Sequence, residues 1–423
     1  MADVYKVPLV LTAQPEGGYT VTSSALPELI TDLCRNSVCC GKRPCRYLRL
    51  PALAGIAFPK LHRAHAGFST REVIMPDAVQ ISLRIPGTAP IQQIARLVQE
   101  VEAAGFAGAG ILDSQLLCRD VFVTMAAAAM QTSHITIFPA VTNPFTRHTS
   151  VLASAMQTVE ELAPGRVKCI IGTGYTSAST IGRKPATLAQ MRACVVSLKG
   201  LLPGKAVDFD GTFGRLQYAA GRNIPVLMAA SGPKAIELAG EIADGALLMV
   251  GYKPGIVAAA LEHLEHGARR GGRRLDDLEI IWAVRTGTAA TTPEAQRQAR
   301  PIAVHWGILR WGAHWLKDAE LQLPEFEVPE AVWKIYPDLS HAANWEEAIA
   351  ATSFVPDEVI AQLCDALGLI GTPERCAKRI MEMANIGVTK LYLMSFQTFV
   401  GPQQEVVAFG DLVFPVLKAQ GYR

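Results

Sequence analysis

From residue 79 onward the chain repeats one pattern, in which a short apolar run is followed by a turn and then by a longer amphipathic or alanine-rich stretch. Residues 79–85 and 91–104 form the first such pair, and Ile94, Val98 and Val101 recur at helical spacing in the second segment. Short apolar strands that alternate with helices predict a parallel sheet, because each crossover helix covers a face of that sheet. Eight such units favour a closed (β/α)8 barrel of the TIM type, with an open doubly wound sheet as the alternative.

The predicted elements divide this part of the chain as follows. Strands are expected at residues 79–85, 108–112, 135–140, 167–171, 225–230, 246–250, 278–284 and 390–394. Helices are expected at residues 91–104, 121–131, 149–162, 187–201, 234–242, 255–270 and 373–385, with one more that begins near Pro293. We therefore predict one barrel domain over residues 75–423, with an insertion at about residues 301–366 before the last strand.

Composition narrows the class of protein. Half of the 423 residues are hydrophobic, which is enough for a packed core of this size. Charged residues make up 18% and the formal net charge is +2, so neither a nucleic acid nor an anionic membrane is expected as a partner. Apolar runs end well before the roughly 18 residues that a membrane span needs. The first ten residues lack the pattern of a secretory signal, and we expect a cytoplasmic protein.

Residues 1–31 carry a hairpin pattern. Two β-rich runs, residues 7–11 and 19–22, flank the turn-forming sequence Pro15-Glu16-Gly17-Gly18. This stretch resembles the opening of HicB-type antitoxin domains, whose acidic helical segment and further strand do not follow in this chain. We expect a truncated antitoxin-like hairpin.

Residues 32–74 show no strand or helix periodicity and are rich in basic residues and Cys. A zinc site is one interpretation of the cysteines in this segment. Their spacing misses the two-residue knuckle that is usual for zinc ligands, so no metal is predicted. A basic nucleic-acid arm is the other alternative. We interpret the segment as a disordered junction, left by a reading-frame change or by a start codon placed upstream of an original Met75. The cluster comprises Cys34, Cys39, Cys40 and Cys45, followed by His62 and His65.

The candidate site follows from the barrel, because active sites of such barrels lie at the carboxyl ends of the strands. Two predicted strand ends carry glycine-bearing turns, Gly172-Thr173-Gly174 and Ser231-Gly232-Pro233. The second runs directly into a helix, whose N–H groups and dipole favour a phosphate. The alternative is that both are only tight turns. The chain lacks a phosphate-binding P-loop, a nucleophile elbow and an H-E-x-x-H motif.

Four ordered segments carry a family resemblance. They are VTNPFTRH at residues 141–148, ELAPGRVKCIIGTG at 161–174, AASGP at 229–233 and LAGEIADGALL at 238–248. Together they resemble the luciferase-like monooxygenase superfamily, and within it 5,10-methylenetetrahydromethanopterin reductase and its bacterial relatives. The resemblance spans about residues 76–423.

This resemblance implies that coenzyme F-420, a deazaflavin, or FMN binds at the mouth of the barrel. It also implies a non-prolyl cis peptide bond, here Ala140–Val141, behind the ring. Asp113, at the end of the second strand, matches an acidic position near the reacting carbon, with a helix cap as the alternative role. The remaining residues expected around the coenzyme are Ala140, Val141, Thr142 and Asn143 beside the ring, and Gly172, Thr173, Gly174, Ala230, Ser231 and Gly232 along the ring edge and phosphate tail.

The implied activity is hydride transfer between C5 or N5 of the coenzyme and a small organic substrate. VTNP and AASGP favour the deazaflavin. One alternative is an FMNH2-dependent two-component monooxygenase served by a separate flavin reductase, and another is a non-catalytic regulatory barrel with an antitoxin-like N-terminus. The family further implies a homodimer. The reductase has an acid near the end of its first strand, where this chain has Leu83-Arg84-Ile85, so reduction of the methanopterin itself does not carry over.

The predicted insertion is rich in aromatic residues, which either form a lid or substrate pocket or pack a subdomain or dimer contact. It holds Trp306, Trp311, Trp315, Trp333 and Trp345, with His305, His314 and His341.

Overall fold

The computed structural model describes residues 78–423 apart from 220, 222, 311–316 and 337, together with three short strands between residues 10 and 32. The chain divides into two compact units, Met1–Met75 and Pro76–Arg423. The N-terminal Cys and His cluster and the predicted junction lie outside the described residues.

The first unit contains the predicted hairpin and one strand more. Strands β1 (Val10–Ala13) and β2 (Tyr19–Thr22) pair antiparallel, and β3 (Thr31–Asp32) pairs antiparallel with β2. We had expected no further strand after the hairpin, and β3 corrects that expectation. Three short strands do not by themselves support the resemblance to a HicB-type domain.

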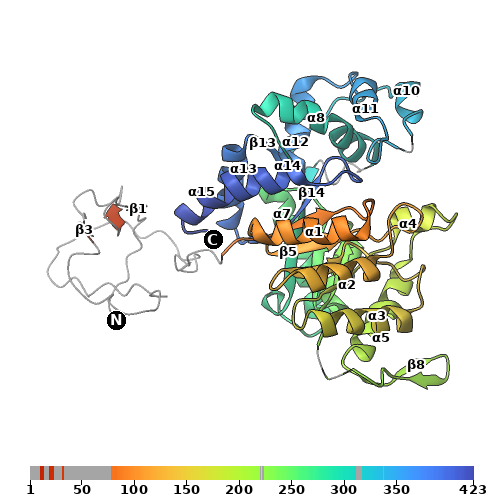
Figure 1. The fold of residues 1–423 in the computed structure, drawn as a ribbon. Helices are drawn as coiled ribbons and strands as arrows, with labels where there is room; N and C mark the ends of the chain where they lie inside the picture. The colour runs from red at the N-terminus through yellow and green to blue at the C-terminus, as the bar shows by residue number, and fades with distance from the viewer. Residues whose placement is uncertain are drawn as a thin grey trace. The chain divides into compact units, whose positions relative to one another are not determined.

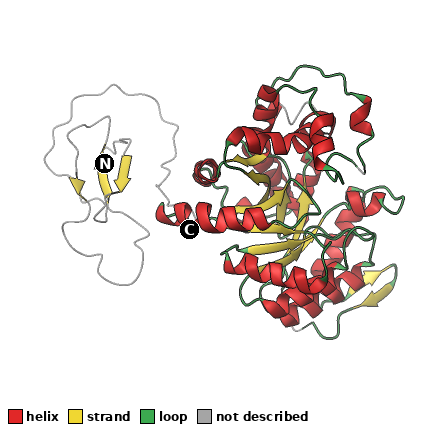
Figure 2. Ribbon diagram, turned by 45° about the horizontal axis from the view of Figure 1, so that its top comes forward, coloured by secondary structure: helices red, strands yellow, loops and turns green. Residues whose placement is uncertain are grey.

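The second unit is the predicted (β/α)8 barrel. Its strands follow the order β6-β5-β4-β14-β12-β11-β10-β7 around the sheet. A parallel bridge between Ile137 and Val167 joins the two ends of that order, which closes the barrel. Figure 2 shows the strands in the middle of this unit with helices around them. The barrel strands are β4 (Gln80–Ile85), β5 (Gly108–Ile111), β6 (Thr136–Pro139), β7 (Cys169–Ile171), β10 (Val226–Ala230), β11 (Gly245–Leu248), β12 (Glu279–Thr288) and β14 (Lys390–Ser395).

The helices that cover these strands lie close to their predicted positions in the sequence, and Figure 1 labels most of them. They are α1 (Ile91–Ala103), α2 (Val121–Gln131), α3 (Thr149–Leu162), α5 (Leu188–Leu201), α6 (Pro233–Ile242), α7 (Pro254–Arg270), α8 (Thr292–Val304) and α13 (Pro373–Ala384). Shorter elements complete the unit: α4 (Tyr175–Ser179), the hairpin β8 (Val207–Phe209) and β9 (Thr212–Gly214), α10 (Glu330–Trp333), α11 (Trp345–Ala351), α12 (Asp357–Leu367), β13 (Gly368–Gly371), α14 (Gln403–Val407), α15 (Phe414–Ala419), the 3-10 helix η1 (Leu275–Asp277) and the π-helices η2 (His305–Arg310) and η3 (Ala408–Val413).

Two separate apolar layers stabilise the barrel. The larger layer lies between strands and helices, where the buried faces of α1, α2 and α3 pack on the sheet. The smaller layer fills the interior of the barrel and includes Phe138, Ile170, Leu227 and Tyr392. Gly110 makes room for it, since a Cβ there would lie 2.5 Å from the Tyr392 ring and 2.6 Å from Phe138. Side chains fill the barrel interior, as is usual for barrels of this size.

The chain leaves the barrel after β12 and returns beside the same strand. Strand β13 pairs in parallel with the end of β12, with Gly368 opposite Arg285. Between them lie α8, α10, α11 and α12, which group together in Figure 1. We call residues 289–367, between the end of β12 and the start of β13, the excursion. The segment expected as an insertion at residues 301–366 falls within it.

Candidate functional site

Three neighbouring strand ends meet at the mouth of the barrel. A Cβ on Gly172, after β7, would lie 2.7 Å from Val141, after β6, and 3.4 Å from Ala229 on β10. The peptide bond Ala140–Val141 is cis, in accord with the expectation. Glycine at position 172 therefore lets three strand ends approach closely, and the structure brings the predicted residues of β6, β7 and β10 together.

Thr142 and Asn143 lie behind this surface, with no exposed area. Asn143 Oδ1 accepts hydrogen bonds from the N–H groups of Phe145 and Thr146, both at 3.0 Å, and its Nδ2 donates to Ser177 Oγ at 3.0 Å. These bonds fold the loop after β6 and fasten it to α4. We expected Thr142 and Asn143 to line the ring; in the structure both side chains are buried, and that of Asn143 supports the loop.

Gly174 begins α4 in the left-handed conformation, with φ at 75°. A Cβ there would lie 2.7 Å from Asn143, so the loop after β7 packs directly on the loop after β6. Thr173 lies between the two glycines, half-buried, and its carbonyl oxygen accepts a hydrogen bond from the Ala186 N–H at 2.9 Å. Both strand ends are thus fixed before any ligand binds.

The second glycine corner opens toward solvent. Ala230 is buried, Ser231 is exposed, and Gly232 precedes α6, whose first residue is Pro233. A Cβ on Gly232 would meet no atom within 4 Å. The first turn of a helix presents N–H groups without partners in that helix, and these attract anions. The structure leaves room for an anion at this corner.

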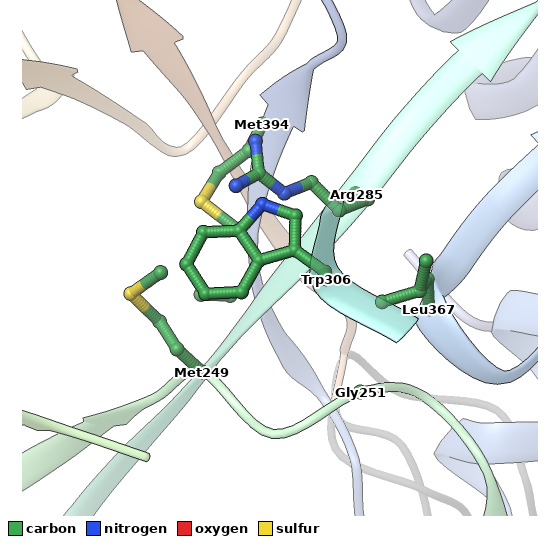
Figure 3. A pocket seen from close by; sticks show the side chains of 7 residues that line it. Met249, Gly251, Arg285, Trp306, Leu367 and Met394 are labelled. Carbon is green, nitrogen blue, oxygen red and sulfur yellow. The ribbon is translucent and has the colours of Figure 1, made fainter. Parts of the chain in front are cut away.

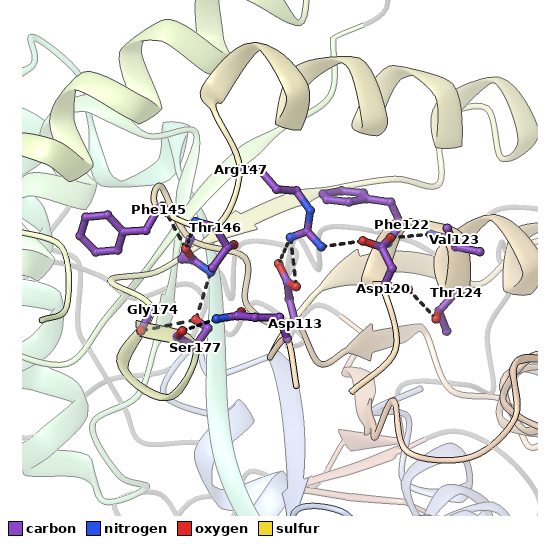
Figure 4. Close-up of polar contacts among 12 residues, drawn as sticks. Asp113, Asp120, Phe122, Val123, Thr124, Phe145, Thr146, Arg147, Gly174 and Ser177 are labelled. Carbon is purple, nitrogen blue, oxygen red and sulfur yellow. Dashed lines mark hydrogen bonds and ion pairs between the residues drawn. The ribbon is translucent and has the colours of Figure 1, made fainter. Parts of the chain in front are cut away.

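Asp113 forms an ion pair that the sequence did not reveal. Its carboxylate accepts from Arg147 Nη1 at 2.8 and 3.1 Å, and Arg147 Nη2 donates to Asp120 Oδ2 at 2.7 Å (Figure 4). Asp120, not Asp113, caps α2 by accepting from the N–H groups of Phe122 and Val123. The alternative of Asp113 as a helix cap is therefore wrong.

Burial and the neighbouring charge act on Asp113 in opposite directions. Desolvation raises the pKa of Asp113, and the Arg147 guanidinium offsets part of that rise. Asp113 is 6% exposed, whereas Asp120 lies nearer to the solvent. For Asp120 the desolvation is outweighed by the hydrogen bond and charge of Arg147 together with the hydrogen bonds from the Val123 and Phe122 N–H groups, and its pKa is lowered. One guanidinium thus joins two carboxylates that differ in their tendency to hold a proton.

A pocket lies at the ends of β11, β12 and β14, and the roughly 250 Å³ of empty space in it includes open solvent. Figure 3 shows the guanidinium of Arg285 beside Met394 and over the Trp306 indole. The Cζ atom of Arg285 lies 5.1 Å from the centroid of that ring. Gly251, Ala283 and Leu367 complete the wall. The sequence did carry a signal for this site, because Arg285 directly follows the apolar run IIWAV within β12.

The aromatic residues of the excursion divide between the two roles considered. Trp306 lines the pocket. Trp345 instead packs in the core and donates a hydrogen bond from its indole to the Gln298 carbonyl at 3.0 Å. Trp333 is 67% exposed, and Trp311, Trp315 and His314 lie outside the described residues.

Neither a metal-binding cluster nor a membrane-spanning helix is present among the described residues. They contain no group of three His, Cys, Asp or Glu side chains that could hold a metal ion. They also contain no helix long and apolar enough to span a membrane.

Comparison with known sequences matches the barrel to named relatives. A 5,10-methylenetetrahydromethanopterin reductase from Methanolobus tindarius is 28% identical over 329 residues, which cover 75% of this chain and 93% of the relative. An F420-dependent glucose-6-phosphate dehydrogenase from Nakamurella multipartita is 28% identical over 188 residues, which cover 42% of this chain and 56% of the relative.

Solved structures support the same fold. The coenzyme F420 dependent tetrahydromethanopterin reductase from Methanopyrus kandleri superposes with a TM-score of 0.66 at 21% identity, covering 80% of this chain and 99% of that one. The oxygenating constituent of 3,6-diketocamphane monooxygenase from Pseudomonas putida, in complex with FMN, gives a TM-score of 0.55 at 16% identity, covering 80% and 98%. At these identities the likeness establishes the barrel alone.

The family model for luciferase-like monooxygenases matches residues 72–390. This range contains all four segments on which the resemblance was based, and it begins just before the first strand of the barrel. The expectation of an oxidoreductase family is confirmed, and the chain belongs to the luciferase-like monooxygenase family.

Proposed function

We propose that this protein is an oxidoreductase that binds coenzyme F420 at the mouth of its barrel and catalyses hydride transfer between the coenzyme and a small organic substrate. The observation that carries the proposal is the meeting of Val141, Gly172 and Ala229 at one surface, beside a helix N-terminus that is open to an anion. The named relatives that depend on F420 support the choice of coenzyme.

The residues present fit such a coenzyme. Ala140 and Val141 with Gly172 offer an apolar, closely packed surface for a flat ring, and a side chain at position 172 would clash with Val141. Gly232 and the first turn of α6 offer space and N–H groups for a phosphate on the tail. Thr173, Gly174, Ala230 and Ser231 join these two parts in our assignment, and Thr142 and Asn143 hold the loop from behind.

When bound, a deazaflavin supplies the hydride chemistry at its C5, and the protein supplies position and exclusion of water. Asp113 is our candidate for the polar group beside the reacting carbon. Its buried carboxyl, with a raised pKa, holds a proton more readily than an exposed one, while Arg147 fixes its orientation through both oxygens. We propose no reduction of methanopterin, because this chain has Leu83-Arg84-Ile85 where the reductase has an acid near the end of its first strand, and Arg84 donates a hydrogen bond to the Ser395 carbonyl.

Equilibrium binding of F420 and of FMN, oxidised and reduced, to the purified full chain tests this function. We expect F420 to bind at least about tenfold more tightly than FMN, which corresponds to about 1.4 kcal/mol. Tight binding of FMNH2 with consumption of oxygen would instead establish the two-component monooxygenase, which requires a separate flavin reductase. Binding of neither coenzyme would exclude both oxidoreductase assignments.

The phosphate corner is tested by Gly232→Asp, with Gly232→Asn as the control of equal size. The two side chains fill the space at the corner equally, but only the aspartate also places a negative charge where the phosphate is proposed. We therefore expect both variants to bind the coenzyme less tightly than the native protein, and Gly232→Asp to bind it less tightly than Gly232→Asn. Both residues are favoured before a helix, and the added atoms meet open space, so both variants should fold. Equal affinities for the two variants would show that no anion binds at this corner.

A further inference from the structure

We propose that Arg285 binds an oxyanion of the substrate, a carboxylate or phosphate carried on a small apolar body, in the pocket at the ends of β11, β12 and β14. This inference rests on the function proposed above and names the class of substrate. It is argued from the position of Arg285, from the charges that face it and from the walls of the pocket.

Arg285 is a buried cation that points into a cavity. Its side chain emerges near the end of β12, opposite Met394 on β14, and the residue is 7% exposed. Among the residues that the structure describes, its buried Nη1 has no hydrogen-bond partner. A buried guanidinium nitrogen normally has an acceptor, because leaving it without one costs free energy.

The groups that face Arg285 do not supply a negative charge at neutral pH. Across the described part of the chain they are Arg84 and Tyr392, and burial raises the pKa of Tyr392, so its phenol stays neutral. Burial, followed by the repulsion from Arg84, lowers the pKa of Arg285 to about 9, which leaves it protonated at pH 7.

The nearby acid does not change this balance. Glu405 is buried and interacts electrostatically with Arg84. Its pKa is raised chiefly by desolvation, which favours the neutral form of its carboxyl group. Arg84 already donates to the Ser395 carbonyl. Two buried cations thus lie near each other with little compensating charge, and an anion bound beside Arg285 would remove that cost.

The pocket walls indicate an organic anion. Met249, Ala283, Leu367 and Met394 are apolar, and the indole of Trp306 backs the guanidinium. A guanidinium presents paired N–H groups that match the two oxygens of a carboxylate or phosphate. The empty space of about 250 Å³ between these walls includes open solvent, so only a small apolar body fits against the walls themselves.

The anion is assigned to the substrate because of where the pocket lies in the barrel. The proposed coenzyme surface is formed by the adjacent strands β6, β7 and β10, and the pocket is formed by the next arc, β11, β12 and β14. Both arcs contribute to one interior cluster, which contains Ala140, Ala283 and Met394. A molecule on Arg285 would therefore lie beside the coenzyme, at the same mouth.

Calorimetric titration of the full chain with benzoate, phenyl phosphate and uncharged benzamide tests the inference. We expect benzoate or phenyl phosphate to bind at least about tenfold more tightly than benzamide, since hydrogen bonds to charged groups are among the strong ones. The tighter of the two anions identifies the oxyanion. Arg285→Met should abolish this preference and Arg285→Lys should keep part of it, while Arg269→Met, on the exposed face of α7, should leave it unchanged.

Folding is followed by the melting temperature of each variant. Removing a buried cation that lacks a partner is expected to leave the melting temperature of Arg285→Met unchanged or raised. Benzoate should raise the melting temperature of the native protein and leave that of Arg285→Met unchanged, because only a ligand that binds the folded state stabilises it.

Three results would overturn the inference. The first is that neither benzoate nor phenyl phosphate binds more tightly than benzamide, and the second is that Arg285→Met keeps the preference for the anion. The third is that Arg285→Met weakens only the binding of reduced F420. In the last case Arg285 serves the coenzyme. Coenzyme binding is measured in the same preparations, so failure here with intact F420 binding refutes the subsite alone. If the native protein does not bind F420, the proposed function is refuted instead.

Discussion

Arg147 joins two carboxylates at the mouth, and the three side chains form a chain from the buried end of β5 to the N-terminus of α2. Asp113 could be singled out from the sequence because it follows a predicted strand. Its partner could not, because the loop that carries Arg147 reaches Asp113 only through the bonds of the buried Asn143. Sequence spacing does not report such a loop conformation, so Arg147 and the true cap, Asp120, were both missed.

The opposite pKa shifts of these two acids predict opposite pH dependence of stability. The pKa of Asp113 is raised, so the folded chain binds its proton more tightly than the unfolded chain does. The free energy of unfolding of the native protein, relative to Asp113→Asn, should therefore be highest below the ordinary pKa of 3.8 and fall as the pH rises through the folded-state pKa.

Asp120 is the matched control, because its pKa is lowered. The native protein should gain stability over Asp120→Asn above pH 3.8 and lose that advantage as the pH falls through the folded-state pKa. Urea unfolding of the three proteins between about pH 3 and pH 7 measures both differences. An advantage over Asp113→Asn that grows with pH would contradict the arrangement described for Asp113.

Helices and strands with strong periodicity could be predicted to within a few residues, and α2 and α3 begin and end where expected. The hairpin of β8 and β9 was missed, although Asp210-Gly211 between the two strands is a recognised hairpin signal, and both residues have positive φ. Strand β13 carries no such signal. Its sequence Gly-Leu-Ile-Gly is short and lacks alternation, and only its pairing with β12 makes it a strand.

Helices α6 and α7 are in backbone contact through glycines. A Cβ on Gly267 of α7 would overlap the Glu237 carbonyl of α6, and one on Gly240 would overlap the Leu264 carbonyl. In an exposed helix Gly→Ala stabilises by about 1 kcal/mol, but here the added methyl must push the helices apart. Gly267→Ala should lower the free energy of unfolding by about 2–3 kcal/mol and weaken coenzyme binding, because α6 begins at the Gly232 corner.

Gly232→Ala serves as the control for that change, because its methyl would meet no atom within 4 Å. Urea unfolding midpoints should show a loss for Gly267→Ala and nearly none for Gly232→Ala. Equal midpoints for the two variants would show that α6 and α7 can separate freely.

At the scale of the whole molecule, the barrel could be predicted because eight repeats of strand and helix leave few other folds. Residues 32–74 could not be interpreted in the same way, since their pattern has no period. The compact unit Pro76–Arg423 contains every candidate site residue named above.

A chain that begins at residue 75 should therefore bind F420 with the affinity of the full chain, within about twofold. A difference of that size is well below a tenfold change in affinity, which corresponds to about 1.4 kcal/mol. Fluorescence titration of both chains measures this. If the shorter chain folds, by its circular dichroism, yet fails to bind, the first 74 residues take part in the site. That outcome would favour the regulatory alternative over an independent enzyme.

The pairing of β13 with the end of β12 has an evolutionary consequence. The excursion that carries Trp306 starts and finishes on adjacent strands, which lie about 4.8 Å apart in a sheet. Its length and sequence can change without moving the barrel, because both attachment points stay fixed. Exchange of this one segment between relatives would thus change the wall that Trp306 contributes to the pocket and leave the ends of β6, β7 and β10 as they are.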